Sequence, residues 1–439
     1  VTTGTALTLI GGLSGDALTD CDFNTAVGFA SLTTDTLGSK TTAVGYQALS
    51  TQNFTSATDT KNTAVGFQAG AAVTTGINNT FIGAASGDAL TDADFNVAIG
   101  THSLTLDTLG SRSTALGYFA LGNQNFTSAT DTYNTAVGYH AGIAITTGIA
   151  NTLIGSLAGD ALTDADNNVA IGIGALGADT KGSRSIAIGE GALAVQNFTS
   201  STLTNNTVVG SAAGFAVSTG VNNTLIGALA GDAITTGANN ICIGFDSGSE
   251  GVGLTTGAKN ILIGNFSNTS AVDVEQEIVI GYDIGGGGTN TVRIGTPGGS
   301  ATLGLDGSDT SWAAASDERL KKDVATSTAG LSFIKDLRPI TYKWKAKDAV
   351  ANTLPQYDAD STDPVYGSGR TQHGFIAQEV KAAINSHSEI KNGFSMWVED
   401  PNGTQQVAPA ALVPMLVKAV QELSAKNDAL ASRITVLEG

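Results

Sequence analysis

Residues 62–66 read Asn62-Thr63-Ala64-Val65-Gly66, and close variants of this pattern recur along the first two thirds of the chain. Alternate side chains of an extended strand point to opposite faces, so Thr63 and Val65 share one face and Ala64 lies on the other. Glycine adopts backbone conformations that other residues avoid, so Gly66 permits a tight corner directly after the strand. The pattern therefore predicts a short strand that ends in a corner.

The aliphatic-glycine pair of this pattern returns at a regular spacing. Its glycines are Gly11, Gly28, Gly45, Gly66, Gly83, Gly100, Gly117, Gly138, Gly155, Gly172, Gly189, Gly210, Gly227, Gly244, Gly264, Gly281 and Gly295. Most steps are 17 residues and three are 21, so that four steps span 72 residues. The longer steps hold near-identical inserts at 53–60, 125–132 and 197–204. This agreement indicates duplication of a block of four rungs.

A strand that returns every 17 residues predicts a β-solenoid. One rung cannot bury its own core, so the rungs must stack. Seventeen rungs at about 4.8 Å each would span roughly 80 Å. Asparagine often precedes the strand, where an asparagine ladder or a turn hydrogen bond would suit it. We expect a mainly β chain with a shaft over residues 1–295 and a junction over 296–315.

The shaft repeat is similar to the heads of trimeric autotransporter adhesins and to related phage fibre shafts, which share a short Val/Ala-Ile-Gly core. The resemblance covers about residues 5–295. It implies three chains whose coils pack side by side as left-handed β-rolls. The 17-residue rung is longer than the usual adhesin repeat. A β-helix formed by one chain alone is the structural alternative.

Composition separates the shaft from the rest of the chain. Of 56 glycines, 49 precede Ser316. Residues 1–315 carry 7 Lys/Arg against 24 Asp/Glu, a net charge of −17, whereas residues 316–439 carry 14 against 15, a net of −1. An acidic shaft argues against nucleic acid as a partner, because phosphate binding needs clustered cations. The sequence contains no run of 18 apolar residues and therefore predicts no membrane span. We interpret Cys21 and Cys242 as free thiols.

Acidic turns raise the question of a metal. Asp88, Asp92 and Asp94 offer closely spaced oxygen ligands of the kind that calcium prefers. They lack the glycine and the terminal glutamate of a dedicated calcium loop. We interpret them as turns facing solvent and predict no metal and no other cofactor.

Four motifs follow the shaft in order: residues 316–323, 337–345, 373–380 and 412–423. Together they closely resemble the intramolecular chaperone autoprocessing domain of phage tail spikes, endosialidase spikes among them, which also occurs in myelin regulatory factor. The resemblance covers residues 316–439. It implies an α+β domain that trimerises its chains and then cleaves itself off.

The resemblance also implies the catalytic pair. A serine hydroxyl needs a base to become a nucleophile, and a lysine acts as that base only when its pKa is lowered by burial or a nearby cation. The family pattern S-D-x-R-x-K pairs Ser316 with Lys321 rather than with the adjacent Lys322, and implies cleavage between Ala315 and Ser316. The chain would be its own substrate, cut once.

Supporting roles are assigned to Asp317, Arg319 and His373, the last at the family's histidine position. Other interpretations stay open for these residues. Ser316 by itself is also a suitable helix N-cap, with Asp317 in the first turn. His373 by itself is also compatible with a packed or surface histidine.

Residues 408–439 predict a helix with a coiled-coil seam. Apolar positions alternate steps of four and three, with one polar member, Asn427, which would fix the register. The seam consists of Leu416, Val420, Leu423, Asn427, Leu430, Ile434 and Leu437. Branched residues at a with Leu at d favour a dimer, whereas the family implies a trimer.

These observations predict a homotrimeric phage tail fibre or tail spike subunit. It would be assembled in the host cytoplasm, would act in the virion beside other tail proteins, and would bind a host-surface receptor, either glycan or protein. A bacterial trimeric surface adhesin with the same shaft is one alternative. A glycan-degrading spike is another, but it would need a unique pair of acids in a cleft.

Overall fold

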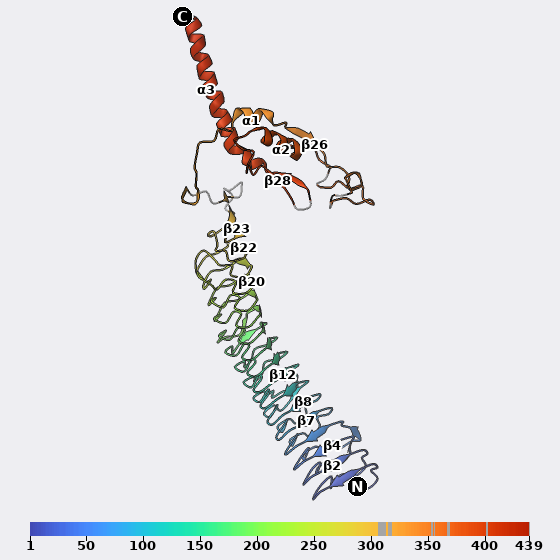
Figure 1. The fold of residues 1–439 in the computed structure, drawn as a ribbon. Helices are drawn as coiled ribbons and strands as arrows, with labels where there is room; N and C mark the ends of the chain where they lie inside the picture. Colours follow the sequence, from blue (N-terminus) through green and yellow to red (C-terminus); the bar gives the residue numbers. More distant parts are fainter. Residues whose placement is uncertain are drawn as a thin grey trace. The chain divides into compact units, whose positions relative to one another are not determined.

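The computed structural model describes residues 1–305, 313–314, 318–352, 354, 356–366, 369–400 and 403–438. The chain divides into two compact units, Val1–Ala315 and Ser316–Gly439. Figure 1 shows the first as a stack of short strands and the second as a small group of helices and strands that ends in one long helix. Each unit is considered by itself.

The first unit is a β-solenoid, as predicted. Seventeen strands form one parallel ladder, in which each strand pairs with the next along the chain. They are β1 (Thr8–Ile10), β2 (Thr25–Val27), β4 (Thr42–Val44), β6 (Thr63–Val65), β7 (Thr80–Ile82), β8 (Val97–Ile99), β10 (Thr114–Leu116), β12 (Thr135–Val137), β13 (Thr152–Ile154), β14 (Val169–Ile171), β16 (Ile186–Ile188), β18 (Thr207–Val209), β19 (Thr224–Ile226), β20 (Ile241–Ile243), β21 (Ile261–Ile263), β22 (Ile278–Gly281) and β23 (Thr291–Thr296). Equivalent residues pair in register; Val65, for example, lies opposite Ile82. The coil therefore closes within a single chain.

Alternation along each strand builds the core. The middle residue points inward and is fully buried, as Ala64 and Ala98 show, while Thr63 and Val65 point outward. Every 72 residues the small middle residue is replaced by a large one: Phe81, Leu153 and Leu225. The 72-residue repeat is thus a repeat of core volume.

The corner glycine is required by the close approach of neighbouring rungs. Gly66 has a φ of +148°, and a Cβ at this position would lie 2.3 Å from the carbonyl oxygen of Gly83. Only glycine fits such a corner without strain. The predicted role of these glycines is confirmed.

A buried asparagine ladder runs alongside the strands. The Nδ2 of Asn62 donates to the Gly76 carbonyl at 2.7 Å, and its Oδ1 accepts the N–H of Asn79 at 2.9 Å. The same pair of bonds recurs from rung to rung, with Thr or Ser replacing Asn before the strands that precede the 21-residue steps. The ladder ends at Glu277, whose N–H donates to Asn260. These bonds confirm the predicted asparagine ladder.

The inserts of the longer steps are anchored by a polar network that the sequence did not predict. Asp35 is fully buried and accepts hydrogen bonds from the N–H groups of Gly38 and Phe54 and from the Gln52 amide. Gln52 in turn accepts from the Nδ2 of Asn62, which joins the network to the ladder. The network recurs at Asp107 with Gln124 and at Asp179 with Gln196.

The inserts also add three small parallel sheets beside the main ladder. Each pairs a two-residue strand of one rung with a two-residue strand of the insert. They are β3 (Gly38–Ser39) with β5 (Thr58–Asp59), β9 (Gly110–Ser111) with β11 (Thr130–Asp131), and β15 (Gly182–Ser183) with β17 (Thr202–Leu203).

The shaft ends in a reversal of direction. After β23 the chain turns at Pro297 and Gly298, and β24 (Gly299–Gly304) returns antiparallel, followed by β25 (Ala313–Ala314). Part of the segment predicted as a junction is therefore strand. Proline and glycine together favour such a turn, which ends the parallel ladder.

The second unit is small and mixed. Its elements are η1 (Glu318–Leu320), α1 (Leu331–Asp336), β26 (Ile340–Tyr342), η2 (Lys347–Ala349), β27 (Gln372–Gly374), α2 (Ala377–Ser386), β28 (Trp397–Glu399), β29 (Gln405–Val407), η3 (Pro409–Leu412) and α3 (Val413–Glu438). Phe333, Val380, Ile384, Met396 and Met415 lie in its core.

The long helix begins later than predicted. The α-helix starts at Val413, after the short 3-10 turn η3, rather than at residue 408. Pro409 and Pro414 account for this, because proline lacks the N–H that a helix interior needs and is tolerated only in a first turn. Among the described residues, no helix is long and apolar enough to cross a membrane.

Candidate functional site

The predicted cleavage site falls at the boundary between the two units. Ala315, Ser316 and Asp317 lie outside the described residues, so the geometry of the predicted Ser-Lys pair stays a prediction. The described flanks are β25, which ends at Ala314, and η1, which begins at Glu318. The site thus separates the last strand of the shaft from the first turn of the second unit.

Lys321 and Arg319 are both exposed in the single chain. The N–H of Lys321 donates to the Glu318 carbonyl at 3.0 Å, which closes η1 and fixes where the lysine backbone lies. A catalytic lysine needs burial or a neighbouring cation to lower its pKa. In the described part of one chain, the Lys321 side chain is not buried in this way.

His373 lies in a pocket on the second unit. It stands in the middle of β27, opposite Thr341 of β26, and its side chain is exposed. The pocket has a volume of about 700 Å³ and is bounded by the β26–β27 pair, the start of α2 and β29. The structure therefore places His373 on a wall of a cavity rather than in the core.

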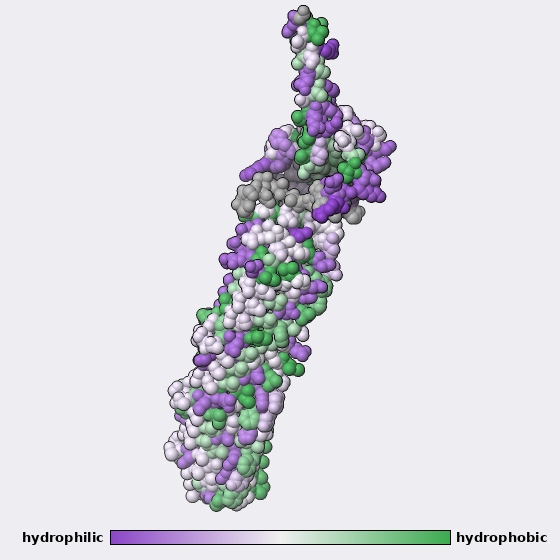
Figure 2. Space-filling model, turned by 90° about the vertical axis from the view of Figure 1, so that its left-hand side faces the viewer, coloured by the Kyte–Doolittle hydropathy of each residue, from purple (hydrophilic) through white to green (hydrophobic). Residues whose placement is uncertain are grey.

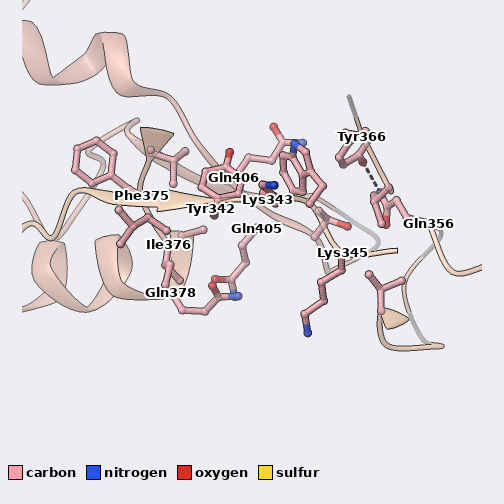
Figure 3. Close-up of a pocket in the computed structure, with 18 of the residues that line it drawn as sticks. Tyr342, Lys343, Lys345, Gln356, Tyr366, Phe375, Ile376, Gln378, Gln405 and Gln406 are labelled. Carbon is pink, nitrogen blue, oxygen red and sulfur yellow. Dashed lines mark hydrogen bonds between the residues drawn. The ribbon is translucent and has the colours of Figure 1, made fainter. Parts of the chain in front are cut away.

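The lining of this pocket combines aromatic rings with amides (Figure 3). Tyr342, Phe375 and Tyr366 supply rings, while Gln378 and Gln405 supply amide groups. Gln356 donates to the Tyr366 hydroxyl at 2.8 Å. This lining offers apolar contact and hydrogen bonds, as ligand sites do. The described residues that line the pocket include no serine or cysteine, so this lining offers neither a hydroxyl of serine nor a thiol as a nucleophile.

Three charged or polar side-chain pairs join segments of this unit. Arg338 binds Glu379 of α2 through two contacts, of which Nε to Oε2 measures 3.0 Å. His387 lies between Asp336 at the end of α1 and Glu389, at 2.8 Å and 3.1 Å. The hydrogen bond with Asp336 raises the pKa of His387, and that with Glu389 acts in the same direction. These pairs have a structural role.

The apolar seam of α3 has no cover along most of its length in the single chain. Only Met415 and Ala419, near the start of the helix, are buried. Leu423, Leu430 and Ile434 are about half exposed, and Asn427 is exposed as well. An apolar stripe of this kind on a helix favours association with other helices.

The acidic turns of the shaft use their carboxylates within the fold. Asp92 accepts the Thr75 hydroxyl at 2.7 Å, and Asp94 accepts the N–H of Ile77 at 2.7 Å. Asp88 accepts the Thr105 hydroxyl. Among the described residues, no group of three His, Cys, Asp or Glu side chains is placed to hold a metal ion.

Comparison with known proteins finds a similarity for part of the second unit. Residues 316–388 match the model of a peptidase family described as "Chaperone of endosialidase". The match begins at Ser316 and includes Lys321 and His373, while the shaft lies outside it. No curated protein and no solved structure matches the chain. The chain therefore joins a β-solenoid to a segment similar to this chaperone family.

Sequence reasoning missed the pocket, the His387 pair and the buried Asp35 network. The spacing of Asp35 and Gln52 matches one 17-residue rung. The recurrence of the same pair at Asp107 and Gln124 was a visible signal of contact between rungs. The pocket and the His387 pair join distant segments and left no periodic signal.

Proposed function

We propose that this chain is the subunit of a homotrimeric fibre, a phage tail fibre or tail spike. Its C-terminal unit would guide assembly and then release itself by cleavage before Ser316. The observation that carries the proposal is the chaperone-family match at residues 316–388, directly after a long repetitive β-solenoid. In the virion the shaft is a structural element that presents a surface to a host receptor.

The repetitive shaft explains why a chaperone is useful. Rungs with nearly identical strands can pair in several wrong registers, and long-range β-structure folds slowly. A C-terminal unit that first holds three chains together aligns them in one register. The exposed seam of α3 supports this step, because it is the apolar helix face that association would bury.

Cleavage is assigned to Ser316 as nucleophile and Lys321 as base. The Ser316 hydroxyl oxygen attacks the carbonyl carbon of Ala315 while Lys321 takes the hydroxyl proton and passes it to the departing Ser316 nitrogen, so that an ester between Ala315 and Ser316 replaces the peptide bond. Water then hydrolyses this ester, which leaves a carboxylate on Ala315 and a free amino group and hydroxyl on Ser316. Because Lys321 is exposed in the single chain, we assign the burial that would activate it to assembly, which makes cleavage follow trimerisation.

The variant Ser316→Ala tests this division of labour. Its mass under denaturing conditions should be that of the intact chain, while its native mass should still be that of a trimer. Ser308→Ala, upstream of the site, is the matched control and should be cleaved as in the wild type. Cleavage of Ser316→Ala before position 316 would contradict the assignment of the nucleophile, and an intact monomer would contradict the chaperone role.

A further inference from the structure

One face of the shaft carries, on every rung, an aliphatic residue that the fold leaves exposed or half-buried. The seventeen residues that immediately precede the corner glycines, from Ile10 to Ile294, are here called the outer aliphatic stripe. Each is Val, Ile or Leu and points away from the core. Eight of the seventeen are exposed, among them Val65, Leu116 and Ile154 at 37%, 41% and 38%, and the other nine are half-buried. A residue type that serves a core is therefore placed on the surface throughout the shaft.

The stripe is continuous because the strands pair in register. Val65 lies opposite Ile82, which lies opposite Ile99, and so on along the ladder. Apolar residues recur along the shaft face shown in Figure 2. Soluble monomers rarely leave an apolar patch of more than a few hundred Å² uncovered. A stripe of this length is a surface for association.

Some rungs carry an aliphatic residue at both outward positions. Most rungs place a threonine at the other outward position, as at Thr63 and Thr135. In β20, β21 and β22 both outward positions are isoleucine. The same holds in β16, at Ile186 and Ile188, so rungs of this kind occur within the shaft as well as in a run of three near its end.

Exposed aromatic rings extend the apolar surface beyond the glycine. Phe29, Tyr46 and Phe67 each directly follow a corner glycine and stack on one another, with ring centroids 5.7 Å and 5.2 Å apart. Tyr118 and Tyr139 repeat this arrangement at 5.6 Å. Each of these rings is about half exposed. Rings of this size contribute strongly to interfaces when they are covered.

The rung spacing identifies what covers the stripe. A partner in contact along its whole length must offer an apolar group at each step of about 4.8 Å. A second copy of this shaft does so on every rung. A receptor or another tail protein would need the same repeat to match it, and neither charge nor hydrogen-bonding groups occur in the stripe to select a different partner.

We propose that the outer aliphatic stripe is the surface on which copies of this chain pack against one another along the shaft. The proposal rests on the homotrimer proposed above and adds the face that each copy uses. In a three-fold assembly the stripes of the three copies face the shared axis, so that all copies are equivalent.

Cysteine labelling of the full chain tests the proposal. The native thiols give little background, because Cys21 and Cys242 are buried and burial raises the pKa of both, that of Cys242 to about 12. The probes are Val65→Cys and Ile154→Cys in the stripe. Thr127→Cys is the matched control, since Thr127 is an exposed residue of an insert. Maleimide labelling rates are measured beside the native mass of each variant.

The expected result is a trimer in which both stripe cysteines react at least about tenfold more slowly than the Thr127→Cys control, because the interface excludes the reagent. A trimer in which they react about as fast as the control would overturn the stripe and leave the proposed function standing. A native mass of one chain in every variant and in the wild type would overturn the trimer and the stripe together.

Discussion

The shaft and the C-terminal unit differ in what positions each residue. In the shaft a side chain is held by the equivalent residue one rung away, as Asn62 is held by Asn79. In the C-terminal unit, side chains distant in sequence hold one another, as Asp336 and His387 do. The first kind of order is periodic and tolerates a shift by a whole repeat, whereas the second is unique.

This difference suggests why the two units occur in one chain. Periodic contacts build a long rod from a short pattern but leave its alignment with other copies underdetermined. A unit with unique contacts can set that alignment once. After cleavage the rod would keep its alignment kinetically, because unfolding of many stacked rungs is slow.

We expect the greatest change in cleavage rate when Lys321 is replaced, and no change when the adjacent Lys322 is replaced. Lys321→Ala should lower the rate of cleavage by about a thousandfold or more, since loss of a general base typically costs 100- to 10,000-fold. Lys322→Ala should be cleaved at the wild-type rate. The rates are read from the disappearance of intact chain under denaturing conditions. Equal loss in both variants would indicate a shared electrostatic role and contradict the assignment of Lys321.

The next prediction concerns the seam of α3. Placing charges there by Leu423→Asp with Leu430→Asp should prevent assembly, because the seam must be desolvated when helices associate. Cleavage should fail in the same variant if it follows assembly. Ala425→Asp, on the opposite side of the same helix, is the control and should assemble. Sedimentation of both variants gives the answer, and full cleavage of an unassembled double variant would show that cleavage does not wait for the trimer.

A smaller effect is expected within the asparagine ladder. The Nδ2 of Asn151 donates to the Ala165 carbonyl and its Oδ1 accepts the N–H of Asn168. Asn151→Ala leaves both buried backbone groups without these bonds, which should cost about 2 to 5 kcal/mol. The exposed Asn123 provides the control variant Asn123→Ala. Thermal unfolding compares them, and equal midpoints would mean that the ladder contributes no stability.

The smallest effect is a pH dependence of the C-terminal unit. Asp336 and Glu389 raise the pKa of His387 in the folded state, so its protonation stabilises the fold. The stabilisation by protonated His387 is fully present at pH values below the ordinary histidine pKa of about 6.5, and it is lost as the pH rises through the raised pKa. Wild type should therefore melt at a higher temperature at pH 6 than at pH 8, and His387→Gln should remove most of that difference. If His387→Gln showed the same difference between its melting temperatures at pH 6 and pH 8 as the wild type, other groups would be responsible for the pH dependence.

Much of the shaft could be predicted because its causes are local and repeated. The inward direction of Ala64 and the corner at Gly66 follow from residues next to each other in the chain. The Asp35–Gln52–Asn62 network could not be derived in the same way, because it depends on which side chains of neighbouring rungs point to one corner. The reversal at Pro297 was missed because the parallel pattern gives no indication of how a ladder ends.

The C-terminal site was predictable only in part. Ser316, Lys321 and His373 were predicted as site residues from the family resemblance; the family match at 316–388 spans these positions, and their roles stay predictions. The pocket beside His373 was not predicted, since it arises where β26, α2 and β29 meet. Asn427 remains the predicted register residue of the seam, and its exposure in one chain is what a partner helix would remove.

In the proposed function, the C-terminal unit assembles the β-solenoid shaft and is then released from it. The most direct test follows newly made wild-type chain over time, with its mass under denaturing conditions and the N-terminal residue of the small fragment. We expect the 44.1 kDa chain to disappear after trimers form, with a fragment that begins at Ser316. A chain that forms trimers and stays intact, or a fragment that begins elsewhere, would contradict it.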